Sequence, residues 1–137
     1  MAQPPIFHVA IAVNDLAETR RFYVDDLGCT ERTDTSTDEY AVINFHGAQL
    51  VAIEAPDQVE KIPDGVGSEP IKHFGIIMDW DDWHAMADRL RAAKTDFLIE
   101  PNVKSHDGIG EVGNMFLRDP SGNNLEFKSY KDRSKVL

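Results

Sequence analysis

The sequence predicts an α+β protein built from two βαβββ modules that pair about a pseudo-twofold axis. The first observation is that the strand-like segment FHVAI at 7–11 matches KHFGI at 72–76. The second is that each half ends on a matching segment, GAQLV at 47–51 and GNNLE at 122–126. Two small modules cannot each bury a sheet face alone, so the repeat predicts one domain in which equivalent strands converge on a shared cavity.

The repeat also sets the expected boundaries. We expect residues 1–137 to form a single domain, with one module at 1–55 and a second at 71–130. The stretch 56–70 between them is rich in proline, glycine and charge, which is typical of a linker.

The first module opens with IFHVAIAV at 6–13, which is apolar except for His8. Its β-branched content predicts a strand buried on both faces, with a buried histidine. Asn14 and Asp15 offer a helix N-cap, apolar residues recur at helical spacing over 16–27, and Gly28 ends the helix.

Three further strands complete this module. The polar segment 30–37 predicts an edge strand and a turn, and YAVINF at 40–45 and AQLVAIE at 48–54 predict two longer strands. Cys29 is the only cysteine, which excludes an internal disulfide, and we expect it to be a small buried residue after the helix.

The second module repeats this order. IKHFGIIM at 71–78 predicts a strand, and residues 79–82 are helix-start residues. The apolar stripe of the second helix consists of Trp83, Met86, Ala87 and Leu90. A strand at 95–101 follows, and the glycine-rich segment 103–113 predicts a loop. We expect Trp83 to be a core or subunit contact, Trp80 to be partly exposed and His84 to face solvent.

A hairpin at 114–127 ends the second module. The turn residues 119–123 reverse the chain, MFL leads in and LEF leads out. Side chains alternate across a strand, so Leu125 and Phe127 share one face and Glu126 takes the other. A carboxylate at this position either faces water or faces the shared cavity.

Composition excludes two classes of function. The 137 residues carry 24 Asp and Glu against 14 Lys and Arg, a formal charge of −10, and the only basic cluster is the tail KDRSK. We therefore expect no nucleic-acid partner. The apolar runs are shorter than the roughly 20 residues of a membrane span and no signal-peptide pattern opens the chain, so we expect a cytoplasmic protein with no membrane partner.

Three residues of metal-ligand type fall at equivalent places in the repeat. His8 and His73 match in the first strands, and a pseudo-twofold axis would bring them together beside Glu126, whose equivalent is the apolar Val51. Two imidazoles and one carboxylate with open positions suit non-haem Fe(II). The alternative is two core histidines satisfied by backbone groups, with Glu126 in solvent.

The motifs FHVAIAVNDLAETRRFY, KHFGIIMDWDDW and MFLRDPSGNNLEF resemble the vicinal oxygen chelate superfamily of glyoxalases, bleomycin-resistance proteins and extradiol dioxygenases. Over nearly the whole chain, the sequence is most similar to the small extradiol-type dioxygenases of that superfamily. The resemblance implies an open half-barrel made of two βαβββ modules, with His8, His73 and Glu126 as metal ligands.

The sequence departs from the family patterns at two places. Glyoxalase I enzymes have a fourth protein ligand where this chain has Val51, which favours the dioxygenase-like plan. Ring-cleaving members usually add an acid-base histidine and a tyrosine, but no tyrosine lies in 114–117. His46 and His106 are the candidate acid-base residues. Gln49 has the same strand parity as Val51, so we expect Gln49 and Val51 to face the cavity, where they contact the substrate or support the site.

The leading hypothesis is an extradiol-dioxygenase-like enzyme that chelates a small, catechol-like substrate with vicinal oxygens on a divalent metal. Fe(II) is the expected metal, with Mn, Zn and Ni as alternatives, and O2 is an expected co-substrate. Two other functions stay open, a non-catalytic small-molecule-binding or resistance module and a glyoxalase-like lyase or isomerase. The resemblance also suggests a homodimer.

Overall fold

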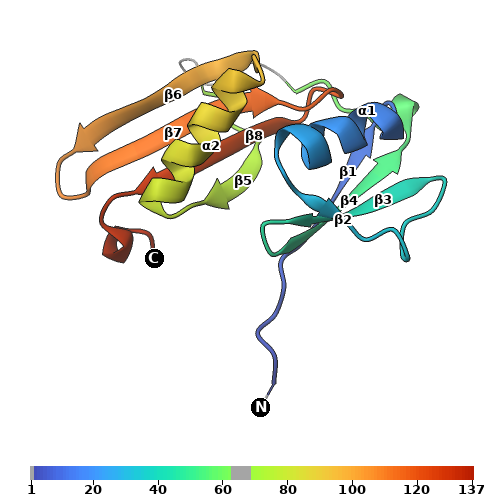
Figure 1. Cartoon of the computed structure of the whole chain (residues 1–137), viewed down its shortest axis with the longest axis horizontal. Helices are drawn as coiled ribbons and strands as arrows, with labels where there is room; N and C mark the ends of the chain where they lie inside the picture. Colours follow the sequence, from blue (N-terminus) through green and yellow to red (C-terminus); the bar gives the residue numbers. More distant parts are fainter. Residues whose placement is uncertain (1, 63–68) are drawn as a thin grey trace. The chain divides into compact units, whose positions relative to one another are not determined.

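The computed structural model describes residues 2–62 and 69–137, which form two compact units, Met1–Lys61 and Ile62–Leu137 (Figure 1). The first unit contains β1 (His8–Val13), α1 (Leu16–Arg20), the π-helix η1 (Arg21–Asp26), β2 (Thr30–Glu31), β3 (Tyr40–Phe45), β4 (Ala48–Glu54) and the 3-10 turn η2 (Pro56–Gln58). The second contains β5 (Phe74–Ile77), α2 (Trp80–Ala92), β6 (Phe97–His106), β7 (Gly110–Arg118), β8 (Asn124–Tyr130) and the 3-10 turn η3 (Arg133–Lys135). The predicted pair of βαβββ modules is confirmed.

The two sheets have the same topology. The first has the strand order β1-β4-β3-β2 and the second the order β5-β8-β7-β6, so the first strand of each module pairs in parallel with its last strand. Ala10 lies opposite Val51 in the first sheet, and Gly75 lies opposite Glu126 in the second. The strand register therefore reproduces the repeat read from the sequence, with Val51 and Glu126 at equivalent positions. The expectation that the two modules make one domain stays a prediction.

The expectation that the first strand is buried on both faces is wrong. Strand β1 is an edge strand of its sheet, and the face that carries Val13 is buried whereas His8 and Ala10 are exposed. Helix α1 packs against β4 of the same sheet and covers only one face. The other face of the strand looked apolar in the sequence because it carries the alanines Ala10 and Ala12, and such small side chains do not require burial.

The first helix begins and ends where the sequence predicts, but its second half is wound as a π-helix. The side chain of Asp15 caps the helix by accepting a hydrogen bond from the amide of Glu18 at 2.9 Å. Over Arg21–Asp26 the bonds lengthen by one residue, as in the bond from Leu27 N to Phe22 O at 3.0 Å. This wider winding buries both Phe22 and Tyr23 against the sheet, and Gly28 then ends it at φ +78°.

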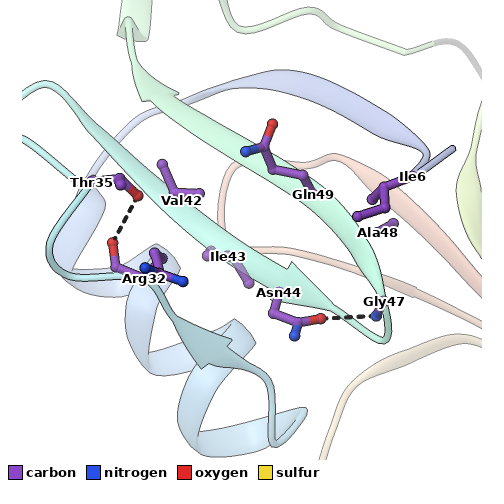
Figure 2. Close-up of a pocket in the computed structure, with 9 residues that line it drawn as sticks. All are labelled: Ile6, Arg32, Thr35, Val42, Ile43, Asn44, Gly47, Ala48 and Gln49. Atoms are coloured by element: carbon purple, nitrogen blue, oxygen red, sulfur yellow. Dashed lines mark hydrogen bonds between the residues drawn. The ribbon is translucent and has the colours of Figure 1, made fainter. Parts of the chain in front are cut away.

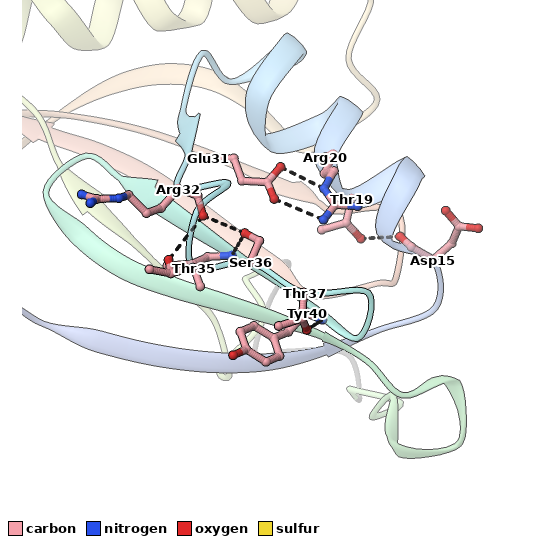
Figure 3. A network of polar contacts seen from close by, with 10 residues as sticks. Asp15, Thr19, Arg20, Glu31, Arg32, Thr35, Ser36, Thr37 and Tyr40 are labelled. Carbon is pink, nitrogen blue, oxygen red and sulfur yellow. Dashed lines mark hydrogen bonds and ion pairs between the residues drawn. The ribbon is translucent and has the colours of Figure 1, made fainter.

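A polar network fixes the short edge strand β2 to helix α1 (Figure 3). Arg20 donates two hydrogen bonds to Glu31, from Nε to Oε1 at 2.9 Å and from Nη2 to Oε2 at 3.1 Å. Burial alone would raise the pKa of Glu31, but hydrogen bonds from Arg20 and Ser36 and the charge of Arg20 outweigh it and lower that pKa. The pair stabilises an edge strand only two residues long.

In the second unit, α2 covers one face of its sheet (Figure 1). The predicted stripe of Trp83, Met86, Ala87 and Leu90 is buried, Trp80 is partly exposed and His84 is exposed, as expected. The indole of Trp83 donates to the carbonyl of Phe127 at 2.9 Å, and its ring lies over Gly113, where a Cβ would sit 3.0 Å from the ring. Helix and sheet therefore meet at the strand that carries Glu126.

The predicted loop at 103–113 is wrong, because strands run through most of it. Strand β6 continues to His106, β7 begins at Gly110, and the two pair in register across the segment. The glycines mark only the tight turn between them, where Gly108 and Gly110 have φ of +78° and +90°. This polar segment has no apolar alternation that would predict a strand, and backbone hydrogen bonds between β6 and β7 make it one.

The turn before Glu126 is held by one buried carboxylate, Asp119. Its Oδ1 accepts hydrogen bonds from the amides of Ser121 and Asn123, both at 2.9 Å, and Gly122 takes φ +90°. This Asx turn, made by the Asp119 side chain, mimics a backbone turn and fixes the start of β8. The predicted hairpin is confirmed.

The expected linker 56–70 lies partly outside the described residues. Its described beginning forms the turn Pro56–Gln58. Cys29 is buried, as predicted, at 6% exposure. In the described part of the chain, no helix combines the length and the apolar character needed to cross a bilayer.

Candidate metal site and the hollow beside it

Strand β8 places Glu126 on the sheet face away from helix α2. Leu125 and Phe127 are fully buried on the helix side, whereas Glu126 is only partly buried on the other. The same alternation puts Lys128 and Tyr130 on the face that carries Glu126. The period-two pattern read from the sequence is thus confirmed, and it continues for three residues beyond the segment LEF, to Tyr130.

The structure brings His73 and Glu126 together. His73 Nε2 lies 3.1 Å from Glu126 Oε1, with the two side chains 30% and 12% exposed. The His73 ring packs edge to face against the ring of the buried Phe116, and the two ring centroids lie 5.0 Å apart. His73 is therefore held in place although it precedes β5.

The hydrogen bonds of His73 define which of its nitrogens carries the proton. Nδ1 lies 2.8 Å from the carbonyl oxygen of Pro70, and a carbonyl can only accept, so Nδ1 donates. In the neutral imidazole, Nε2 then holds a lone pair that points at a carboxylate oxygen. Two acceptors at this distance repel unless a proton or a metal cation lies between them.

Burial raises the pKa of the Glu126 carboxyl, and the nearby charge of Glu69 also raises it. The positive charge of Lys128 and the charge and hydrogen bond of His73 lower it in part. A partly buried carboxylate with this raised pKa is one whose charge is poorly satisfied by the protein alone. A divalent cation would satisfy it.

In the first unit, His8 also uses its Nδ1 nitrogen to bond to an oxygen acceptor. Its Nδ1 lies 2.9 Å from Gln49 Oε1, so Nδ1 donates to the amide oxygen and Nε2 is left with a lone pair. Gln49 lies opposite His8 in the register of β1 and β4. Metal-bound histidines usually make such a bond through the second ring nitrogen, which fixes tautomer and orientation.

These donors fit a divalent metal by their chemistry. Each histidine has one nitrogen tied to an acceptor, and Glu126 is acceptor-only when ionised. Among the described residues, no group of three or more His, Cys, Asp and Glu side chains is close enough to hold a metal ion. The structure thus brings together His73 and Glu126, and the inclusion of His8 stays a prediction.

His106 lies in the same hollow as His73 and Glu126. A hollow of about 380 Å³ on this face is lined by both of those residues, by His106 at the end of β6, and by Asn114, Lys128 and Tyr130. The sequence placed this candidate acid-base residue in a loop, whereas the structure places it at the end of strand β6. The long pairing of β6 with β7 carries it there.

His46 occupies a different kind of position. It is the first residue of the two-residue turn between β3 and β4, where His46 and Gly47 have φ of +51° and +94°. This is the conformation of a type I′ hairpin turn. Desolvation lowers the pKa of His46, whose ring meets the Phe45 ring edge to face at 5.3 Å. Its catalytic role stays a prediction.

A second hollow, of about 360 Å³, lies on the first sheet (Figure 2). Gln49 lines it together with Val42 and Asn44 of the neighbouring strand, and Arg32 stands at its side. Val51 lies opposite Val42 and continues this face. As expected from strand parity, Gln49 and Val51 share the face of His8, away from the buried Leu50.

The sequence reasoning did not single out Lys128, Tyr130 or Asn114. Strand alternation counted on from Glu126 would have found the first two, since they follow at intervals of two residues. Asn114 lies opposite Lys128 on β7, so the hairpin register would have found it. The tyrosine sought before the turn is absent there, and one is instead present in the hollow after it.

Comparison with known proteins agrees with this architecture. Residues 6–127 match the family model described as Glyoxalase/Bleomycin resistance protein/Dioxygenase superfamily. Comparison with curated proteins gave no match. A glyoxalase/bleomycin resistance protein/dioxygenase structure from Alicyclobacillus acidocaldarius is 29% identical, with a TM-score of 0.79 over 97% of this chain and 96% of that one.

More distant structures share the fold. A genomically encoded fosfomycin resistance protein from Listeria monocytogenes is 12% identical, with a TM-score of 0.71 over 98% of this chain and all (100%) of that one. A lactoylglutathione lyase from Agrobacterium tumefaciens is 16% identical, with a TM-score of 0.63 over 94% and 97%. The class is therefore a glyoxalase/dioxygenase-fold protein. This chain belongs to the glyoxalase/bleomycin resistance protein/dioxygenase superfamily.

Proposed function

We propose that this protein is a divalent-metal-dependent enzyme that chelates a small substrate through two vicinal oxygens, with extradiol-dioxygenase-type chemistry on Fe(II). His8, His73 and Glu126 would hold the metal. The observation that carries the proposal is the pair of His73 and Glu126, in which Nε2 lies 3.1 Å from Oε1 while Nδ1 bonds to Pro70 O, so that Nε2 can bind a metal whenever it carries no proton. When bound, Fe(II) would supply Lewis-acid and redox chemistry toward a substrate hydroxyl and O2.

The surrounding residues would orient the site and move protons. Gln49 would keep His8 in the tautomer with a free Nε2, as Pro70 does for His73. His106 would take the proton of a substrate hydroxyl, because it lines the same hollow as His73 and Glu126. This third histidine favours an enzyme over a binding module, which needs no acid-base group.

Metal binding tests the ligand set directly. Glu126→Ala and His73→Ala should each weaken divalent metal binding by roughly a hundredfold or more, because each removes a ligand from a three-ligand site. The apo fold should be retained, as circular dichroism would show. Glu100→Ala is the matched control, since Glu100 is an exposed carboxylate on β6 of the same sheet. Equal affinity in Glu126→Ala and Glu100→Ala would contradict the site.

Turnover separates the remaining functions. His106→Gln should leave metal affinity unchanged and lower turnover by about 10²–10⁴-fold, the usual share of an acid-base group. Oxygen uptake with a panel of catechols would distinguish the oxygenase from a lyase or isomerase. Fewer than about 0.1 metal ions per chain after loading with Fe(II) would favour the non-catalytic binding module.

A further inference from the structure

Two asparagine side chains on neighbouring strands are joined by a hydrogen bond beside the hollow of Glu126. Asn102 on β6 lies opposite Asn114 on β7, and Asn102 Nδ2 lies 2.8 Å from Asn114 Oδ1. The same nitrogen donates to the backbone carbonyl of Glu100 at 2.9 Å. Both side chains are half-buried, and Asn114 lines the hollow of about 380 Å³ that Glu126 also lines.

The backbone carbonyl fixes which way both amides are turned. A carbonyl oxygen can only accept, so the atom of Asn102 that contacts Glu100 O must be the nitrogen. The atom of Asn114 that faces this nitrogen must then be the oxygen, because two amide nitrogens both donate and cannot share a hydrogen bond. The carboxamide of Asn114 therefore turns its NH2 group away from Asn102.

This NH2 group is a donor that the protein does not use. Among residues 2–62 and 69–137, no acceptor lies within hydrogen-bonding distance of Asn114 Nδ2. Every side-chain nitrogen and oxygen of these residues that is shielded from solvent has a partner, so Asn114 Nδ2 is open to the hollow that this side chain lines. An amide NH2 only donates, and a ligand satisfies it by presenting an acceptor.

The place of this donor relative to Glu126 suits a substituent of a chelated ligand. Asn114 lies opposite Lys128, and Glu126 precedes Lys128 by two residues, so Asn114 and Glu126 are diagonal neighbours on one face of the sheet. Diagonal neighbours lie about 7–8 Å apart, a distance that a six-membered ring with one substituent can span. A ligand whose vicinal oxygens lie beside Glu126 would thus bring the substituent on the far side of its ring to Asn114.

The hollow carries charges of both signs, because Lys128 is accompanied there by the carboxylates of Glu69 and Glu126. Net charge therefore gives no reason for an ionised substituent, and hydrogen bonding decides what Asn114 recognises. A carbonyl oxygen accepts and brings no proton of its own, so it matches an amide that only donates. An analogue without that oxygen leaves the NH2 group unpaired when it displaces water.

We propose that Asn114 donates to a carbonyl oxygen of the substrate, so that the substrate is a vicinal-oxygen compound with a carbonyl group on the far side of its ring. Asn102 is the positioning residue, because it turns the NH2 group of Asn114 into the hollow. This inference rests on the proposed function, since the place of the carbonyl is counted from oxygens bound at the metal. It narrows the substrate class from catechols in general to those with a carbonyl substituent.

Two probes that differ in this acceptor test the pairing. The substituent of 3,4-dihydroxyacetophenone contains a carbonyl where that of 4-ethylcatechol contains a methylene. The full chain is loaded with Zn(II), and both affinities are measured by calorimetry. The acetyl compound is also the stronger acid, so the ratio of the two affinities is compared between wild type and variant. Asn114→Leu should lower this ratio about three- to tenfold, the value of one hydrogen bond between uncharged groups, and leave metal affinity unchanged.

A variant of Asn102 tests the turning of the amide. Asn102→Asp puts acceptor oxygens in place of the nitrogen, so the NH2 group of Asn114 should turn toward the new carboxylate and its oxygen toward the hollow. The ratio should then fall as far as in Asn114→Leu, whereas a role in packing alone would leave it unchanged because the two side chains have nearly the same shape. Ser105→Leu is the matched control, since Ser105 is exposed on β6 and does not line the hollow.

The outcomes separate this inference from the proposed function. A wild-type ratio in Asn114→Leu would overturn the carbonyl site and leave the chelation of vicinal oxygens standing, and a wild-type ratio in Asn102→Asp would overturn the positioning role. Failure of both probes to bind the Zn(II)-loaded wild type would contradict the proposed function, and the carbonyl site with it. Proton–nitrogen NMR provides a test without any variant, because the side-chain NH2 resonances of Asn114 should move downfield with the acetyl probe only. Equal shifts with both probes would count against the carbonyl site.

Discussion

Gly75→Ala tests how closely strand β5 is fitted against β8. Gly75 lies opposite Glu126 in the parallel pair, and a methyl group added there would lie 2.7 Å from the carbonyl carbon of Glu126 and 3.0 Å from its nitrogen, in collision with the carbonyl oxygen. Ordinary contacts between carbon atoms are about 3.5 Å or longer. The backbone would therefore have to move by about 0.8 Å or more, since the atoms in the way belong to the main chain.

This displacement has two expected costs. Overpacking of a well-packed site costs about 1–3 kcal/mol, and a strand of four residues at a sheet edge has few other bonds to hold it, so we expect a loss of about 2–3 kcal/mol in the free energy of unfolding. His73 directly precedes this strand, so its Nε2 should move relative to Glu126. Metal affinity should then fall at least tenfold, on the order of one misplaced ligand.

Urea unfolding followed by tryptophan fluorescence measures the first effect, and competition with a chromophoric chelator measures the second. Ala10→Gly is the matched control, because Ala10 occupies the equivalent place opposite Val51 and already carries a methyl group. Its loss should cost only about 0.5–1 kcal/mol. An unfolding free energy of Gly75→Ala within about 0.5 kcal/mol of the wild type would refute the close approach of these strands.

Three further predictions follow from single contacts. Glu31→Gln should lower the free energy of unfolding by about 0.5–1 kcal/mol at pH 7, a modest value because Arg20 is 38% exposed. The folded pKa of Glu31 lies below its ordinary 4.5, so the stabilisation by this ion pair is complete above pH 4.5 and is lost as the pH falls through the folded pKa. The urea midpoints of the variant and the wild type should therefore converge in acid. Trp83→Phe should cost about 1–3 kcal/mol, because the carbonyl of Phe127 loses a buried donor, and an unchanged melting temperature would contradict this. Val51→Glu should place a carboxylate at the position equivalent to Glu126 and tighten Zn(II) or Ni(II) binding in chelator competition, while any O2 consumption is lost; unchanged affinity would refute the equivalent placement.

Much of the candidate site could be read from local pattern. Alternation along β8 is a property of any strand, so the turn at 119–123 and the buried neighbours Leu125 and Phe127 were enough to place Glu126 on the opposite face. The internal repeat then gave the register, because equivalent segments fold in the same way. Val51 and Glu126 accordingly hold equivalent places in the two sheets.

Other features depend on which strands become neighbours. The polar segment that contains His106 has no apolar periodicity, and only its long-range pairing with β7 makes it a strand and carries His106 to the hollow of Glu126. The tautomer of His73 depends likewise on the carbonyl of Pro70, three residues earlier, whose direction no local pattern encodes. Burial of the first strand was overestimated because hydrophobicity does not say how many faces a neighbour covers.

The sequence by itself thus determined the two βαβββ modules, their equivalent positions and the face of Glu126, because these follow from local periodicity and repetition. Only the tertiary structure decided that His73 Nε2 lies beside a carboxylate oxygen of Glu126 and that His106 and Lys128 share a hollow with them. The physical reason is that alternation fixes where a side chain points from its own strand. What it then meets is fixed by hydrogen bonds and packing between residues far apart in the chain.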